Sequence, residues 1–285
     1  MLKSVALVGS LLLPLFMAGC ASTSNSDTAR TSYTAERNAM PAALAAQDTR
    51  SGTAKAEKAA LVFPTNPGGG LAGRSLRVSR VSDIALRDKE VVLTFDDGPM
   101  PGRTEKVLAA LDRYGVKATF LMVGQMANAY PAIARKVAAR GHTIGTHTQS
   151  HRNLAGMSTA NAKAEIERGR KSVAAAVGSG NVAPFFRFPY LASTSALRRD
   201  LASNGVVVID VDIDSKDYFK SSGDQVRART IARIERRRKG VILLHDIHGR
   251  TAEMLPGFLA DLKSRGYKVV ALKPGRGSFL VASLD

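Results

Sequence analysis

The sequence has little of several residue types, and each shortage narrows what the protein can be. With one cysteine among 285 residues, no disulfide bond can form within the chain. Only five histidines are present, so a site that uses imidazole has few positions to draw on. The apolar run at residues 5–18 is too short to span a bilayer comfortably, and the chain contains no internal repeat.

The first twenty residues have the order of an export signal. Lys3 precedes the apolar run and Gly19 follows it, which gives a basic region and a hydrophobic region of signal-peptide length. The next residue, Cys20, resembles the lipidated cysteine of a bacterial lipoprotein, although Met17 stands where Leu is more usual. A plain secretory signal is the alternative, but an unpaired thiol would be an odd choice for an exported protein. We therefore expect an exported lipoprotein of the bacterial cell envelope (periplasm or outer membrane), anchored to a membrane through Cys20.

The composition divides the chain into three parts. After the signal at residues 1–20, residues 21–82 are rich in Ala, Ser, Thr, Asn and Gly, which is typical of a flexible tether. Residues 42–61 could form a transient helix within it. The remaining residues, 83–285, number about two hundred and suffice for one domain with a sizeable core.

Within this domain, apolar runs alternate with amphipathic segments. The strand-like runs lie near residues 91, 118–123, 143, 185, 206, 241 and 267–272. The helix-like segments lie near residues 105, 132, 160, 196, 227 and 252. Such an alternation predicts an α/β fold with a parallel sheet and right-handed crossovers.

The segment Thr-Phe-Asp-Asp-Gly-Pro at residues 94–99 ends an apolar run with two adjacent carboxylates, Asp96 and Asp97. Neighbouring side chains at the end of a strand cannot point the same way. One carboxylate can therefore bind a metal ion while the other stays free as a base, which is the division of labour that metal-assisted hydrolysis requires. An ordinary Asp-Gly-Pro turn is the alternative interpretation.

Two of the five histidines, His147 and His151, lie four residues apart after a short apolar stretch. Both imidazoles can converge on one ion if the segment makes a helical turn. Together with one carboxylate, as in the set Asp97, His147 and His151, they would leave a position open for water or substrate. A pair of solvated loop histidines is the alternative.

Three further polar blocks follow strand-like runs. Phe-Arg-Phe-Pro-Tyr occupies residues 186–190, a group of aspartates follows the valines near residue 206, and His-Asp-Ile-His occupies residues 245–248. All the chemical blocks therefore fall at the carboxyl ends of strands, where the active sites of β/α barrels lie.

In this order and at these separations, the five blocks resemble the polysaccharide deacetylases of carbohydrate esterase family 4, whose catalytic unit is the NodB homology domain. The likeness covers roughly residues 90–272. It implies a distorted (β/α)7 barrel with the active site at the C-terminal ends of the strands, which fits the seven strand-like runs.

The same resemblance implies an activity. Members hydrolyse N-acetyl groups from an N-acetylglucosamine-containing polysaccharide, of the peptidoglycan, poly-N-acetylglucosamine or chitin type, and release acetate in a metal-dependent reaction. Two alternatives stay open at this point. The site could act as an O-acetyl esterase on a xylan-type glycan, or the fold could serve a non-catalytic glycan-binding protein.

The resemblance also implies a role for each matched residue. Asp96 would be the general base and His245 the general acid. Asp97, His147 and His151 would hold a divalent metal, usually zinc, with another ion such as Co²⁺ as an alternative.

Other matched residues would support these groups. Arg187 would pair with and orient Asp96, and Asp217 would tune the acid histidine, with Asp214 as the rival position. The residues expected to contact the substrate are Pro189, Tyr190, whose backbone N–H would bind the oxyanion, and Leu243, which would line the acetyl pocket.

Two positions depart from the family pattern. Members commonly carry Gly after the Pro-Tyr pair and Trp after the fourth-block aspartate, whereas this chain has Leu191 and Tyr218. Leu191 restricts the backbone beside the expected oxyanion site, and Tyr218 keeps an aromatic ring with a polar tip. Neither change touches a metal ligand or a proton-transfer residue, so only the substrate fit is affected.

The formal net charge is +17, and a dense part of it lies in residues 227–239, which predict one basic helix. Binding to nucleic-acid phosphates is one interpretation, but it suits an exported protein poorly. A solvated helix face whose cations suit the helix C-terminus is a second. Attraction to anionic envelope polymers or lipid head groups is a third, and charge alone does not choose among them.

Overall fold

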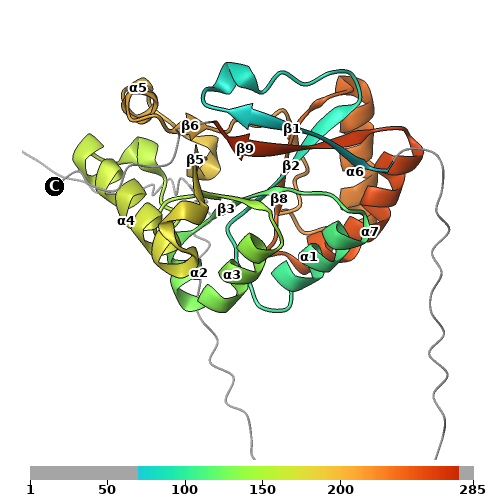
Figure 1. Ribbon diagram of the computed structural model, residues 1–285, viewed down its shortest axis with the longest axis horizontal. Coiled ribbons are helices and arrows are strands. Elements are labelled where there is room, and N and C mark those ends of the chain that lie inside the picture. Colours follow the sequence, from blue (N-terminus) through green and yellow to red (C-terminus); the bar gives the residue numbers. More distant parts are fainter. Residues whose placement is uncertain (1–69, 276–285) are drawn as a thin grey trace, which may run out of the picture. The chain divides into compact units, whose positions relative to one another are not determined.

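The computed structural model describes residues 70–275, in which parallel strands alternate with helices (Figure 1). The strands are β1 (Ala72–Val78), β2 (Glu90–Asp96), β3 (Thr119–Met122), β4 (Thr143–Thr146), β5 (Val182–Phe186), β6 (Val207–Val208), β7 (Ile213–Asp214), β8 (Gly240–His245) and β9 (Lys268–Pro274). The α-helices are α1 (Thr104–Arg113), α2 (Gly124–Ala129), α3 (Pro131–Ala139), α4 (Thr159–Val177), α5 (Ser195–Ser203), α6 (Gly223–Arg237) and α7 (Gly249–Ser264). Short 3-10 helices are η1 (Val81–Asp83), η2 (Leu154–Gly156), η3 (Ser179–Asn181) and η4 (Pro189–Leu191). In this part of the chain, no helix combines the length and the apolar character that crossing a membrane requires.

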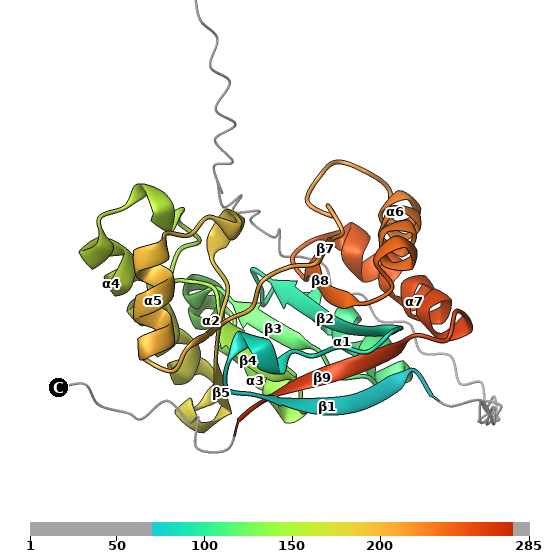
Figure 2. The same cartoon turned by 90° about the horizontal axis from the view of Figure 1, so that it is seen from above.

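All strand pairings within residues 70–275 are parallel. The path runs β1-β9-β2-β3-β4-β5-β6, and β8 pairs with both β2 and β7. β2 is the central strand, because it pairs with β3, β8 and β9. The strands form a nearly closed barrel with helices packed around it, which confirms the predicted distorted (β/α)7 architecture (Figure 2).

The folded domain begins earlier in the chain than residue 83, the boundary that composition predicted. Residues 72–78, placed in the tether, form β1 and pair with β9 from Ala72 opposite Val269 to Val78 opposite Pro274. Within this strand only Val78 is buried, so its composition resembles that of a linker. The strand forms because it covers an edge of β9 that would otherwise be open. β7 also escaped prediction, since two residues carry no periodicity.

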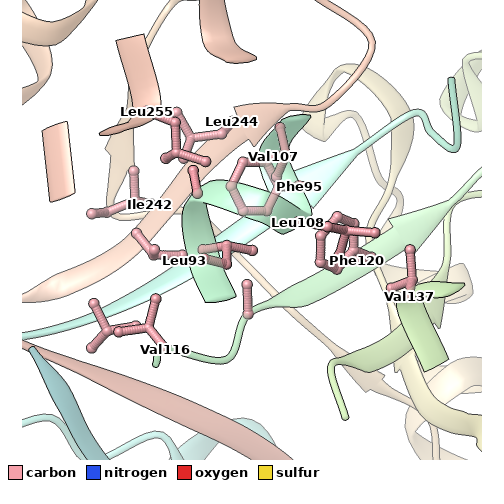
Figure 3. Packing of buried hydrophobic residues seen from close by; sticks show 14 of the residues in the cluster. Leu93, Phe95, Val107, Leu108, Val116, Phe120, Val137, Ile242, Leu244 and Leu255 are labelled. Atoms are coloured by element: carbon pink, nitrogen blue, oxygen red, sulfur yellow. The ribbon is translucent and has the colours of Figure 1, made fainter. Parts of the chain in front are cut away.

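The alternation of β2 sets the direction of the site residues. Leu93 and Phe95 pack against the outer helices, and the ring of Phe95 stacks on that of Phe120 with centroids 5.1 Å apart (Figure 3). Val92 belongs instead to a second cluster, made almost entirely of strand residues inside the barrel. Because strand side chains alternate between faces, Asp96 also points into the barrel interior.

β8 repeats this arrangement beside β2. Ile242 and Leu244 pack on the helix side, whereas Val241 belongs to the interior cluster. By the same alternation, His245 faces the interior. The register places His245 directly opposite Asp96, so the parallel pairing alone brings an imidazole beside a carboxylate.

Candidate active site

Asp96 and Asp97 lie at the end of β2 and have different neighbours. Asp96 is 1% exposed and accepts a hydrogen bond of 2.7 Å from Nη1 of Arg187. Asp97 has a φ of 76°, in the left-handed region, which turns its side chain out of the strand alternation. The backbone therefore gives two chemically identical residues separate surroundings.

Arg187 is fixed within the barrel interior. Its side chain is 1% exposed, Nε donates to the carbonyl oxygen of Ile209 at 2.8 Å, and Nη1 also donates to the hydroxyl of Thr94 at 2.8 Å. A guanidinium buried with these partners has one orientation available. It therefore holds the Asp96 carboxylate in one orientation as well.

His147 and His151 bring their Nε2 atoms to the same oxygen of Asp97. Oδ1 of Asp97 lies 3.6 Å from Nε2 of His147 and 3.3 Å from Nε2 of His151. Nδ1 of His147 donates to the carbonyl oxygen of Arg187 at 2.7 Å, which leaves the lone pair on Nε2 directed at the site. Burial lowers the pKa of His147, so the ring is in the neutral form that binds metals.

These three side chains fit a divalent metal ion. Their candidate ligand atoms all lie within 4.8 Å of one another. Oδ1 of Asp97 is buried and has no hydrogen-bond partner among the described residues. An unsatisfied buried carboxylate oxygen is unfavourable, and a cation between the three groups would satisfy it. Two imidazoles and one carboxylate are also the donor set of open zinc sites.

The loop that carries both histidines is fixed by α4, through residues that the sequence analysis missed. Glu165 is 1% exposed, and its Oε1 accepts from the backbone N–H and the hydroxyl of Ser150 at 2.6 and 2.5 Å. At Gly169 a Cβ would lie 2.4 Å from the backbone of Thr148, so only glycine allows this approach. Neither residue has a sequence signal, because each looks like an ordinary position of an amphipathic helix.

His245 forms a buried pair with Asp217. Its Nδ1 donates to Oδ1 of Asp217 at 2.6 Å, and its backbone N–H donates to Oδ2 at 2.8 Å. The hydroxyl of Thr251 on α7 donates to the same Oδ2 at 2.6 Å. Of the two aspartates that the sequence left open, Asp217 is thus the one beside His245. Asp214 instead accepts from the hydroxyl of Tyr218 at 2.8 Å.

The pairing controls the protonation of His245. Burial by itself would lower the pKa of this imidazole, but the hydrogen bond to Asp217 and its charge, with contributions from Asp97 and Asp96, raise it to about 9. The ring is therefore protonated at neutral pH. With Nδ1 bound to Asp217, the proton on Nε2 is the one available for transfer.

Three arginines hold the backbone of the loop that carries Asp217, and we call them the arginine clamp (Arg229, Arg233 and Arg250). Arg229 and Arg233 come from α6, and Arg250 comes from α7. The hydrogen bonds run from Arg229 to the carbonyl oxygens of Ser215 (2.9 Å) and Lys216 (3.1 Å), from Arg233 to that of Asp214, and from Arg250 to those of Asp217 (3.1 Å) and Phe219.

The clamp accounts for part of the basic helix. Besides its two members on α6, Arg227 pairs with Asp261 and Arg238 with Asp88. Several arginines of the basic helix therefore have partners within the protein, although the sequence analysis interpreted the helix as a face for solvent or for polyanions. Sequence reasoning missed this use, because the arginines meet the loop only in the tertiary structure, which periodicity does not describe.

Asp246 is a further buried carboxyl next to His245. It is 1% exposed, accepts from the hydroxyl of Thr104 at 2.6 Å, and lies so near Gly98 that a Cβ there would be 2.2 Å from it. Burial raises the pKa of Asp246 to about 7. Asp246 therefore packs against the turn that follows Asp97. In the sequence, only its place in the block at residues 245–248 indicated that it belongs to the site.

The expected substrate-contact residues lie around this site. Pro189 is buried, and Tyr190 is 67% exposed with the centroid of its ring 4.8 Å from that of His151. Leu243 is on β8, two residues before His245, so both side chains face the barrel interior. Cys20, the expected lipidation site, lies outside the described residues.

Comparison with known proteins gives the family. A family model described as polysaccharide deacetylase matches residues 83–209. The chain is 30% identical over 195 residues to a chitin deacetylase of Colletotrichum lindemuthianum, a match that covers 64% of this chain and 77% of that protein. The chain belongs to the polysaccharide deacetylase family.

Other members of the polysaccharide deacetylase family are similar too. The peptidoglycan-N-acetylglucosamine deacetylase PgdA of Listeria monocytogenes is 31% identical over 188 residues, which are 66% of this chain and 39% of that protein. The solved structure of a Bdellovibrio bacteriovorus peptidoglycan deacetylase has a TM-score of 0.64 and 34% identity, and the match covers 75% of this chain and 60% of that one. This chain thus spans less than two thirds of both proteins.

Proposed function

We propose that this polysaccharide deacetylase hydrolyses N-acetyl groups from an N-acetylglucosamine-containing polysaccharide, releasing acetate and a free amino sugar. The observation that carries the proposal is the position of Asp96, which lies opposite His245 in the strand register and 3.8 Å from Nε2 of His147. A carboxylate, a protonated imidazole and a three-residue metal set are thus gathered in one place. The names of the relatives, peptidoglycan and chitin deacetylases, support the substrate class.

Asp97, His147 and His151 would hold the metal, and zinc is the proposed ion. Bound there, a divalent ion supplies polarisation of the acetyl carbonyl and acidification of a water molecule. The neutral His147 ring and the unpartnered Oδ1 of Asp97 support this role.

Asp96 would act as the general base and take the proton of the attacking water. Arg187 keeps its carboxylate turned toward the site through the 2.7 Å hydrogen bond to Oδ1. The second oxygen, Oδ2, is the one directed toward His147 and is therefore the proposed acceptor. A base held in this way contributes roughly a factor of 10² to 10⁴ in rate.

His245 would act as the general acid. It would donate the Nε2 proton to the nitrogen of the sugar as the bond between that nitrogen and the acetyl carbon breaks. Asp217 keeps the imidazole in the required tautomer and protonated to about pH 9. The backbone N–H of Tyr190 is the proposed donor to the oxyanion, and Pro189 and Leu243 would complete the pocket for the acetyl group.

The direct test is acetate release by the purified protein from peptidoglycan, poly-N-acetylglucosamine and chitin, each with and without a chelator. We expect release from at least one polymer, loss of it with chelator, and recovery with added zinc. Acetylated xylan in the same assay distinguishes O-deacetylation. Release from xylan alone would contradict the proposal, as would release that chelation leaves unchanged.

We further propose that the mature protein is exported and tethered to a membrane of the cell envelope by lipid on Cys20. The support is the position of the one cysteine directly after the apolar run. Cys20→Ser should move the protein to the soluble fraction of lysed cells, since the anchor is lost. If the variant sediments with membranes as the parent does, the lipid anchor is wrong.

A further inference from the structure

The end of the barrel opposite the active site contains two buried nitrogen atoms that have no hydrogen-bond partner among the described residues. One is Nε2 of His142, which directly precedes β4, and the other is Nη1 of Arg140, the C-cap residue of α3. Both residues lie at the amino end of β4, whereas the residues of the active site follow the carboxyl ends of strands. Buried polar groups are nearly always hydrogen-bonded, so two such atoms from one turn indicate a binding site.

The backbone fixes the tautomer of His142 and therefore the role of its Nε2. The side chain is 5% exposed, and Nδ1 accepts a hydrogen bond of 3.2 Å from the backbone N–H of Ala118. A backbone N–H can only donate, so Nδ1 carries no proton and the proton of the neutral ring is on Nε2. Burial and nearby cations lower the pKa of His142 to about 3, which keeps the ring neutral. Nε2 is therefore a donor, as Nη1 of Arg140 is, and both require an acceptor.

Three cations lie around this turn, namely Lys117, Arg140 and Lys273. Besides burial, the charge of each lowers the pKa of His142. Nζ of Lys273 donates to the carbonyl oxygen of Gly141 at 2.9 Å, and Cε of Lys117 lies 4.0 Å from where a Cβ on Gly141 would be. Burial and the charge of Lys117 lower the pKa of Lys273, so the two ammonium groups repel each other. We call Lys117, Arg140, His142 and Lys273 the basal cluster.

One carboxylate offsets only part of this charge. Oδ2 of Asp112, near the end of α1, lies 3.2 Å from Nε of Arg140, and Oδ1 lies 3.9 Å from Nζ of Lys117. Three cations and one carboxylate leave a net charge of +2. A phosphate ion matches this environment, because it brings negative charge and several oxygen acceptors. A water molecule would accept from the donors but would not offset the charge.

We propose that the basal cluster binds a small oxyanion of the phosphate type, at the end of the barrel remote from the active site. Nε2 of His142 and Nη1 of Arg140 would donate to its oxygens, and the two ammonium groups would offset its charge. Because both donor atoms are buried, only a small ion can reach them. The side chains of Arg140 and Lys117 are each 38% exposed, which leaves a route from solvent. The inference does not depend on the proposed function.

Titration calorimetry of the purified protein with inorganic phosphate, at constant ionic strength, tests the site. We expect one phosphate ion to bind at the basal cluster with a Kd of about 1 mM or lower, because charge-assisted hydrogen bonds to buried donors are strong. The Kd should be the same with and without a chelator, whereas phosphate held by a metal ion would be lost with it. Saturating phosphate should also raise the melting temperature, since it binds only the folded protein.

Two substitutions each remove one donor. Arg140→Lys keeps the positive charge but lacks Nη1, and His142→Asn keeps an acceptor for the N–H of Ala118 but lacks Nε2. We expect each to raise the Kd for phosphate about tenfold or more, the scale of one charge-assisted hydrogen bond. Lys273→Met, which removes a charge without removing a buried donor, should raise it roughly fivefold. Lys106→Gln, which removes an exposed charge near the start of α1, is the matched control and should leave the Kd unchanged.

The melting temperature of each variant without phosphate shows whether the fold survives. The Arg140 side chain is partly exposed, so Arg140→Lys should fold as the parent does even if His142→Asn does not. Three results would overturn the inference: no saturable phosphate binding by the parent, binding that chelation abolishes, or an unchanged Kd in Arg140→Lys. Equal weakening by Lys106→Gln and Arg140→Lys would also overturn it, because the effect would then come from net charge alone.

Discussion

The proposed metal-binding half of the site (Asp97, His147 and His151) and the proposed acid half (His245 and Asp217) are built by different means. In the metal half, Asp97, Thr148 and His151 all have φ in the left-handed region, at 76°, 68° and 55°. In the acid half, His245 continues a regular strand, and its partner Asp217 has a carboxylate filled by three hydrogen bonds. One half thus has left-handed backbone at two of its own site residues, Asp97 and His151, whereas the other holds its site residues by dense polar contacts and has its left-handed residue beside them, at Lys216 (φ 56°).

The two halves also differ in what they leave unsatisfied. Asp97 has a buried oxygen with no partner among the described residues, whereas every oxygen of Asp217 accepts at least one hydrogen bond. A bound cation would satisfy the metal half, whereas the acid half is satisfied within the protein alone. Loss of the metal and loss of the general acid should therefore be separable by experiment, although both halves lie at the same end of the barrel.

The largest effect should come from removing a ligand of the metal half. His147→Ala or His151→Ala leaves two protein ligands, too few for a stable tetrahedral site, so bound zinc and activity should vanish together. Zinc per protein, measured by elemental analysis, and acetate release are the two readouts. Full zinc occupancy in both variants would show that the ion lies elsewhere.

The two adjacent carboxylates test the division between binding and proton transfer. Asp96→Asn should retain zinc but lower kcat by at least about a hundredfold, because the amide cannot accept the proton of water. Asp97→Asn should instead weaken zinc binding, since it removes one of the three ligands. If excess zinc restores the Asp96 variant and not the Asp97 variant, the two roles are reversed.

The acid half has a pH signature that the metal half lacks. Because the pKa of His245 is raised to about 9, its acid form is present at neutral pH and is lost as the pH rises through about 9. In Asp217→Asn the hydrogen bond and the charge of the carboxylate are lost, and only the charges of Asp97 and Asp96 still oppose burial, so the pKa of His245 should fall well below 9. The high-pH limb of kcat should move down accordingly while zinc content stays unchanged. If the high-pH limb of the variant stays near pH 9, the limb reports the titration of a group other than His245.

The arginine clamp gives the smallest and most selective effect. Arg229→Gln removes two backbone contacts of the loop that holds Asp217, at about 1 kcal/mol of positioning each at most, so kcat should fall roughly fivefold. KM should change less, and the high-pH limb should shift down because the hydrogen bond between Asp217 and His245 loosens. Arg236→Gln, exposed on the same helix, is the matched control and should behave as the parent. If Arg229→Gln lowers kcat without shifting the pH profile, the clamp stabilises the protein but does not position Asp217.

The sequence by itself determined the order and chemistry of the barrel. The seven predicted strands correspond to β2–β6, β8 and β9, because buried parallel strands need continuous apolar runs that are visible locally. Polar residues directly after those runs included most of those that the structure gathers at the strand ends, among them Asp96, His147 and His245, whereas Asp217 follows β7, which was not predicted. Parallel pairing puts all such ends at one mouth of the barrel, so local order was enough to predict their proximity.

Only the tertiary structure decided the surroundings and the partner of each of those residues. The φ of Asp97 separates it from Asp96, and the contact at 2.6 Å selects Asp217 over Asp214 as the partner of His245. Glu165 and the arginine clamp bind loops outside their own helices, and periodicity carries no information on such contacts. The exposed edge strand β1 likewise exists only because β9 is there to pair with it. Local patterns record which face of an element is buried, but the partner of each buried or charged group depends on which elements the fold brings together.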